Sequence, residues 1–213
     1  MTINLEILES AYLLGEKSLE NLRTKELVPN MMVRRRLTRA SKLVMELKDL
    51  VDFEEGRVIC GSAYGEAGVS ANILNAIKDN VPISPTDFQN SVYNTAVSYL
   101  SIVSKNHHEI LTISSGDKTA LNVLRAGAIK ALDGDELLLV CFETIDIANI
   151  EQINHCIDFL ECGVALRVRV SDQKATMSIE KSKTRGAPNS ISELLHVAQN
   201  SKKIPHPILE VVL

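Results

Sequence analysis

A short turn between an apolar strand and an apolar helix holds the side chains that come closest to a reactive site. The segment from Glu109 to Leu132 passes through Ser114-Ser115-Gly116-Asp117 directly into a helix. A strand-turn-helix elbow lifts one side chain to the top of a sheet, where acyl-transfer enzymes place their nucleophile. This elbow contains no cysteine. The alternative is that Ser114 and Ser115 only cap the helix, because serine satisfies free N–H groups of a first turn.

The other residues that could do chemistry show no pattern for it. The cysteines form no CxxC pair, and Cys60 and Cys141 lie inside apolar runs, which indicates reduced, buried thiols rather than disulfides or zinc ligands. The glycines between Gly61 and Gly68 have neither the GxGxxG order nor a GK[ST] ending, so they predict no phosphate loop. None of the five histidines is paired with the elbow by a motif. We therefore expect no metal and no cofactor.

One basic run could bind an acidic partner. Arg34, Arg35 and Arg36 are followed by Arg39, at the expected start of an amphipathic helix from Arg35 to Val51. Positive charge is unfavourable at a helix N-terminus, so these arginines need another source of stabilisation. Solvation is the simplest one, and a docking surface for an acidic protein is the alternative.

Composition limits the class of protein. The chain has 213 residues, which is within the range of one domain, and we expect a single domain over 1–213. Its formal net charge of −4 argues against binding to nucleic acid. No apolar run approaches the roughly 18 residues of a membrane span, and no basic signal segment is present. We expect a soluble protein of the reducing cytoplasm.

The hydrophobic pattern predicts strands that alternate with helices, followed by a hairpin. Val164 to Val170 alternates apolar and charged residues, and Ala175 to Ile179 is its expected antiparallel partner across a turn. The other expected elements are strands at 57–62, 110–113 and 137–142, helices at 35–51, 70–78, 90–102 and 190–199, a turn at 84–87, the elbow helix, and a loop at 181–189. The order favours an α/β fold.

Several of these segments together resemble a known family. They are Arg34-Arg35-Arg36-Leu37-Thr38-Arg39, Gly61-Ser62-Ala63-Tyr64-Gly65-Glu66, Ser84-Pro85-Thr86-Asp87-Phe88, Asn90-Ser91-Val92-Tyr93-Asn94 and the elbow. In this order and spacing, over roughly residues 30 to 170, they resemble the β-ketoacyl synthase-like N-terminal domain of bacterial aryl-polyene and type II polyketide pathways, a thiolase-like protein.

The resemblance implies an α/β thiolase-like half-fold, a mixed sheet flanked by helices. In that family the nucleophilic cysteine lies at the first elbow, where this chain has Ser114, Ser115, Gly116 and Asp117. A cysteine thiolate is needed to hold the acyl chain as a thioester. The remaining catalytic residues belong to a second half, for which 213 residues leave no room. The resemblance therefore implies an inactive homologue rather than an enzyme.

The same resemblance implies a partner. Silent relatives act as chain-length factors that pair with an active, full-length β-ketoacyl synthase in polyketide or fatty-acid-type chain elongation. Their interface joins the strands before the two elbows, which here points to His108 to Ser114. The implied interface residues are Asn90, Ser91, Asn94, His108, Ile110 and Thr112. The implied docking residues for an acyl carrier protein are Arg34, Arg35, Arg36 and Arg39.

Two other functions remain open. A homodimeric scaffold, or a module that binds acyl carrier protein, would use the arginines without a ketosynthase. A small hydrolase would use Ser114 or Ser115, but GxSxG is absent and no base is identifiable.

Overall fold

The computed structural model describes residues 1–152, 154, 156–179 and 184–213. Within these residues the strands form one mixed sheet of seven, in the order β3-β2-β4-β5-β1-β7-β6. The strands are β1 (Thr2–Gly15), β2 (Arg57–Gly61), β3 (Ile110–Ile113), β4 (Leu137–Thr144), β5 (Glu161–Val170), β6 (Met177–Ser178) and β7 (Ile208–Val212). The order confirms the expected mixed sheet and makes β3 and β6 its two edges.

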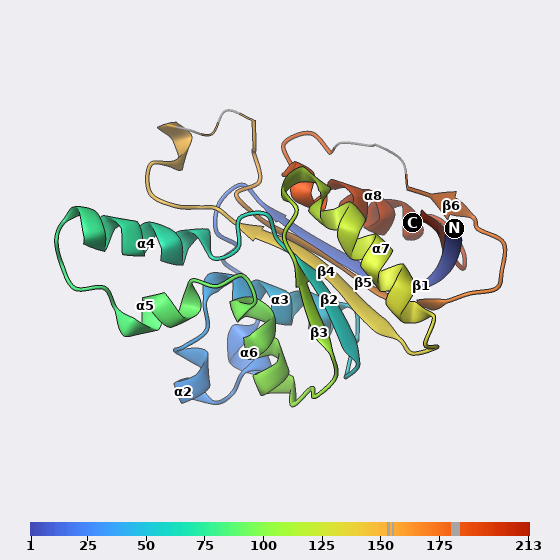
Figure 1. Ribbon diagram of the computed structural model, residues 1–213, viewed down its shortest axis with the longest axis horizontal. Coiled ribbons are helices and arrows are strands. Elements are labelled where there is room, and N and C mark those ends of the chain that lie inside the picture. Colours follow the sequence, from blue (N-terminus) through green and yellow to red (C-terminus); the bar gives the residue numbers. More distant parts are fainter. Residues whose placement is uncertain (153, 155, 180–183) are drawn as a thin grey trace.

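Helices cover both faces of the sheet (Figure 1). Helices α7 and α8 lie on one face, and α3 and α6 lie on the other. The helices are α1 (Thr24–Leu27), α2 (Met31–Arg34), α3 (Arg39–Leu50), α4 (Ala67–Lys78), α5 (Pro85–Asn90), α6 (Thr95–Ser104), α7 (Thr119–Ala131) and α8 (Ser192–Ser201), with 3₁₀ turns η1 (Gly116–Lys118), η2 (Ile150–Gln152) and η3 (Asn189–Ile191).

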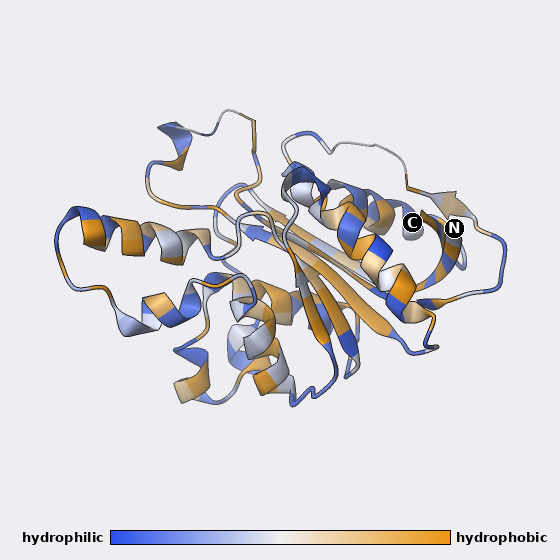
Figure 2. Cartoon of the chain, viewed as in Figure 1, coloured by the Kyte–Doolittle hydropathy of each residue, from blue (hydrophilic) through white to orange (hydrophobic). Residues whose placement is uncertain are grey.

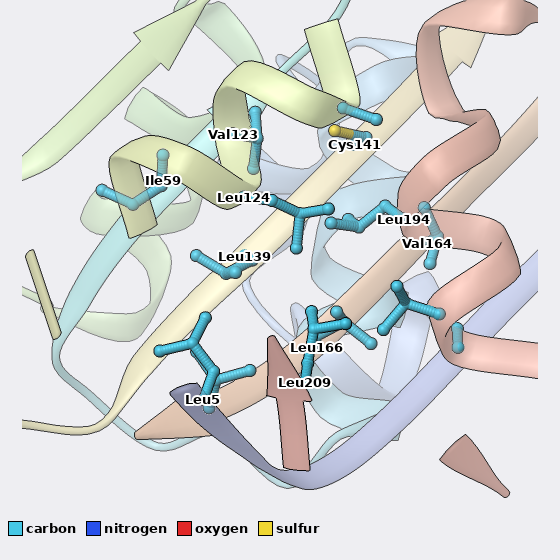
Figure 3. Close-up of a cluster of buried hydrophobic side chains, with 14 of the residues drawn as sticks. Leu5, Ile59, Val123, Leu124, Leu139, Cys141, Val164, Leu166, Leu194 and Leu209 are labelled. Carbon is cyan, nitrogen blue, oxygen red and sulfur yellow. The ribbon is translucent and has the colours of Figure 1, made fainter. Parts of the chain in front are cut away.

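Strand β4 lies inside the sheet, and every one of its residues is buried. It pairs in parallel with β2 and antiparallel with β5. A strand covered on both faces reads as a continuous apolar run, which is why the sequence located it correctly. Figure 3 shows the layer between this sheet and the helices, where Val123 and Leu124 of α7 and Leu194 of α8 lie over Leu139 and Leu166.

The predicted hairpin after residue 164 is wrong. Strand β5 pairs antiparallel with β4 on one side and with β1 on the other, so no position beside it is left for a third strand. Of the segment 175–179, only Met177–Ser178 forms a strand, and this strand runs parallel to β7. The alternation in β5 is a true strand signal, but the partners of this strand lie far away in the sequence.

The predicted helix at Arg35 begins later, at Arg39. The side chain of Thr38 caps it by accepting a hydrogen bond from the amide of Ser41. Arg34 ends the short α2 instead, and a cation is favourable at a helix C-terminus. Its Nη1 atom also donates to the carbonyl oxygens of Val28 and Pro29, at 2.8 and 3.2 Å. The basic run therefore does not oppose the dipole of α3.

Helices α4 and α5 form an arm that extends away from the sheet (Figure 1). Ser84 caps α5, and Pro85 occupies its first turn, so the expected turn at 84–87 is the start of a helix. Helix α4 has no buried residue, although it is largely apolar in sequence (Figure 2). The large apolar side chains exposed on the arm are Leu74, Ile77, Val81, Ile83 and Phe88. The arm therefore presents an apolar surface to solvent.

Candidate functional site

The elbow forms where the sequence predicts it. Strand β3 ends at Ile113, and residues 114–118 are all exposed before α7 enters the core. Gly116 takes a positive φ of 55°, which a residue with a side chain rarely adopts, and this allows the chain to turn sharply into η1. The apolar elbow helix is not buried along its whole length, because Ile129 and Leu132 at its far end are each 51% exposed.

The elbow is fixed by Thr119 rather than by its serines. The side chain of Ser115 makes no capping hydrogen bond. The hydroxyl of Thr119 accepts a hydrogen bond from the backbone N–H of Ser115 at 3.0 Å and donates one to the carbonyl oxygen of Gly116 at 2.7 Å. Thr119 is completely buried. No side chain of the described residues caps the first turn of α7, so the capping role considered for the serines is not found.

A buried carboxylate organises the loops beside the elbow. Glu143, near the end of β4, is fully buried, and it accepts hydrogen bonds from the hydroxyl groups of Ser62 and Ser190 and from the amides of Ala63 and Tyr64. The four distances lie between 2.6 and 3.1 Å. Burial raises the pKa of Glu143, although these donors oppose the shift. Glu143 therefore ties the loop after β2 to η3.

One of the segments held by Glu143 also contacts the tip of the elbow. Asn189 of η3 donates a hydrogen bond to the carboxylate of Asp117 at 3.1 Å. Tyr64 is only partly exposed to solvent. The burial of its remaining surface raises the pKa of its phenol, and the negative charges of Glu143 and Asp117 add to this rise. We call Tyr64, Glu143, Asn189 and the loops that carry them the elbow rim. Within it, the carboxylate of Glu143 and the side-chain amide of Asn189 are both hydrogen-bonded.

No activated nucleophile is found at the elbow. Cys60, Cys141 and Cys162 are buried and free, and burial raises the pKa of each thiol, which keeps it protonated. Cys156 is exposed but lies in the loop between β4 and β5.

General bases and metal ligands are missing from the elbow as well. In the described part of the chain, no histidine hydrogen-bonds to Ser114 or Ser115, and His155 lies outside that part. Nor do the described residues include three His, Cys, Asp or Glu side chains placed to hold a metal ion. Among the described residues, the elbow serines thus have no hydrogen-bonded base to activate a hydroxyl.

The structure brings several predicted interface residues together. Asn94, Ile110 and Thr112 line one groove of about 500 Å³ between α6 and β3, together with Ile102. Asn90 and Asn94 line an adjoining groove of about 540 Å³. Ser91 lies between them in sequence and bonds locally to the carbonyl of Phe88, while His108 is exposed just before β3. These residues follow the open edge of the sheet.

The four predicted docking arginines are in different environments. Arg35 and Arg36 are exposed, and Arg36 lines the groove that contains Asn90. Arg34 is held by the backbone carbonyls of the segment before α2. Arg39 forms an ion pair with the buried Glu161, with its Nε atom 2.6 Å from the carboxylate. Only part of the basic run is therefore presented to solvent.

A second buried carboxylate stands at the base of the arm. Glu66, just before α4, is 4% exposed and accepts a hydrogen bond of 2.7 Å from the hydroxyl of Thr38. Burial raises its pKa to about 7. Glu66 also lines a cavity of about 500 Å³ with Arg39 and Asp146. Sequence reasoning missed the roles of Glu66 and Glu143, because a single glutamate in a turn or at the end of an apolar run gives no signal that it is buried.

Comparison with known proteins gives one family. The family model for the β-ketoacyl synthase N-terminal domain matches residues 15–209. No curated protein is similar enough in sequence to be matched. The span of the family model takes in the elbow, the rim and the arm.

Solved structures show the same fold. The chain resembles the ketosynthase ApeO in complex with its chain length factor ApeC from Xenorhabdus doucetiae, with a TM-score of 0.65, 21% identity, and coverage of 83% of this chain and 85% of that chain. For the ishigamide ketosynthase/chain length factor the TM-score is 0.63 at 12% identity, and the match covers 80% of this chain and 63% of that chain. For a β-ketoacyl synthase from Burkholderia phymatum STM815 the TM-score is 0.55 at 9% identity, with coverage of 80% of this chain and 60% of that chain. The shared feature is the expected half-fold, a mixed sheet flanked by helices.

Proposed function

Because the chain belongs to the β-ketoacyl synthase N-terminal domain family, we propose that it is a noncatalytic, chain-length-factor-like subunit that pairs with a full-length β-ketoacyl synthase. The pair would act in polyketide, aryl-polyene or fatty-acid-type chain elongation. The names of two similar structures, each a ketosynthase with a chain length factor, support this choice.

The observation that carries the proposal is the open edge at β3. This strand pairs with β2 on one side only, so the backbone groups on its other side are available to another strand. Ile102, which lines the groove beside β3, is 65% exposed, and Val92 in the adjoining groove is 50% exposed. An unpaired strand next to exposed apolar side chains favours association with a second protein.

The silent elbow supports the noncatalytic part of the proposal. Within the part of the chain that the structure describes, the hydroxyl groups of Ser114 and Ser115 have no base in hydrogen-bond contact, and a serine needs such a base to attack a thioester. The buried thiols are protonated and enclosed. The chemistry of the complex would therefore be performed by the partner.

The test is coexpression with a candidate β-ketoacyl synthase, followed by light scattering on the purified material. We expect a one-to-one complex. Ile102→Asp should abolish it, since a charge would be buried at the interface. Val212→Asp is the matched control, because Val212 is 56% exposed on β7, near the opposite edge of the sheet.

Three results would contradict the proposal. One is a monomer indifferent to the synthase, and another is equal loss of the complex in both variants. A stable homodimer that ignores the synthase would instead favour the scaffold function.

A second candidate function rests on Arg35 and Arg36. Their exposure beside the groove of Asn90 fits a homodimeric module that binds the acidic acyl carrier protein without a ketosynthase. Such binding would weaken strongly as salt is raised from about 50 to about 500 mM, because this change shortens the electrostatic screening length roughly threefold. Binding that does not respond to salt, or to Arg35→Ala with Arg36→Ala, would exclude this function.

A further inference from the structure

The backbone N–H of Ser115 is already occupied. It donates to the hydroxyl of Thr119, a side chain that is fully buried. That hydroxyl in turn donates to the carbonyl oxygen of Gly116, so one side chain fixes the backbone of both Ser115 and Gly116. The backbone amide of residue 115 therefore points to the hydroxyl of Thr119 inside the protein. It is the amide closest to any reacting side chain at this position.

The packing beneath the elbow makes room for this arrangement. A Cβ atom at Gly61 would lie 2.7 Å from the Cγ2 atom of Thr119 and 2.6 Å from a methyl group of Val123. Because Gly61 has no Cβ atom, Thr119 can pack directly against β2 with its hydroxyl under the turn. The position of the hydroxyl is set by the fold rather than by solvent.

Acyl transfer needs more than a nucleophile. Attack on a thioester places negative charge on the carbonyl oxygen, and enzymes stabilise that oxygen with backbone N–H groups near the nucleophile. Loss of one such donor costs about 10²- to 10³-fold in rate. An N–H group that is already bonded to an internal hydroxyl is not available for this purpose.

We propose that Thr119 is a second cause of the silence of the elbow, independent of the missing cysteine, because it holds the Ser115 amide away from any bound acyl group. This inference rests on the proposed noncatalytic function. Thr119 acts here as a positioning residue and does not touch substrate. A thiol introduced at position 115 would thus react with simple alkylating agents but would transfer acyl groups poorly.

The test compares three variants that all carry Cys156→Ser, because Cys156 is the exposed native cysteine. They are Ser115→Cys, Ser115→Cys with Thr119→Val, and Ser115→Cys with Thr119→Ser. Valine keeps the shape of threonine and removes the hydroxyl, while serine keeps the hydroxyl and is the matched control. Mass spectrometry of the peptide containing residue 115 follows both reactions.

The acyl donor is hexanoyl-N-acetylcysteamine. The thiol introduced by Ser115→Cys loses its proton to solvent, and its sulfur attacks the carbonyl carbon to form a new C–S bond. The oxyanion then collapses, the original C–S bond breaks, and the released N-acetylcysteamine thiolate takes a proton from water. Iodoacetamide alkylation of the same thiol forms no oxyanion, so it reports only on access and ionisation.

We expect Thr119→Val to raise hexanoyl transfer at least tenfold while alkylation changes less than twofold. Thr119→Ser should leave both rates within twofold of Ser115→Cys alone. An unchanged ratio of the two rates in the valine variant would overturn the inference.

A second measurement needs no variant. In the unmodified protein, the amide hydrogen of Ser115 should exchange at least tenfold more slowly than that of the exposed Gly116. Equal exchange would also overturn the inference. Acylation of Ser115 in the unmodified protein would contradict the proposed noncatalytic function. The experiments therefore distinguish failure of the Thr119 inference from failure of the proposed function.

Discussion

The elbow rim and the α4–α5 arm are adjacent in the chain but are stabilised in opposite ways. The rim is polar, and its buried Glu143 accepts hydrogen bonds from four donors. The arm is apolar and exposed, and α4 buries none of its residues. A satisfied polar network fixes one conformation, whereas an uncovered apolar surface is suited to a partner. The difference separates the part of the molecule that must be rigid from the part available for contact.

Among the substitutions that test this difference between rim and arm, we expect the largest loss of stability at Glu143. Glu143→Ala leaves four donors unsatisfied inside the protein, and we expect it to lower the free energy of unfolding by about 3 kcal/mol or more. Urea denaturation measures this loss. Glu143→Gln is the control, since it keeps the volume and part of the acceptor capacity and should lose clearly less. A cost below about 1 kcal/mol for alanine would show that the rim is not held by this carboxylate.

The base of the arm should respond to pH. Glu66 has a pKa of about 7 in the folded protein, above its ordinary value, so the folded state binds the proton more tightly than the unfolded state. Stability should therefore rise as the pH falls from 8 to 5, by up to about 3 kcal/mol from this group. Below the ordinary pKa of glutamate the gain is complete.

Glu66→Gln checks this expectation, because glutamine cannot ionise. Unfolding measured across that pH range should show a smaller slope in the variant. Some slope should remain, since burial also raises the pKa of Glu143. Identical slopes in both proteins would mean that Glu66 is not the group that titrates.

The surface of the arm should contribute least to stability. Leu74 and Ile77 are 65% and 60% exposed, so replacing both with serine should change the free energy of unfolding by less than about 0.5 kcal/mol. Leu124→Ala, at a fully buried position of α7, is the contrasting control and should cost about 2 to 5 kcal/mol. A large loss from the arm variant would show that the arm is part of the core.

The sequence predicted those elements whose signal is local. The continuous apolar run of β4 and the turn residues of the elbow were recognised because a few neighbouring residues determine each of them. Strand β1 is absent from the predicted elements, although Ile3, Leu5 and Ile7 alternate with more exposed residues and are buried.

Pairing and burial of charge could not be predicted in the same way. The partners of β5 are set by the packing of the whole sheet, and its register with β1 joins residues that are far apart in the sequence, such as Leu5 and Val170. Glu143 and Glu66 are buried because loops from elsewhere close over them. Neither feature is encoded in a short window of sequence.

The place of β1 in the sheet has a consequence for synthesis. Both neighbours of β1 come from late in the chain, since β5 begins at Glu161 and β7 begins at Ile208. At a translation rate of about 5 to 20 residues per second, β1 waits on the order of 10 to 30 s for its first partner. During this interval its apolar residues have no strand to pair with. The sheet can therefore close around residues 2–15 only after β5 and β7 have both been synthesised.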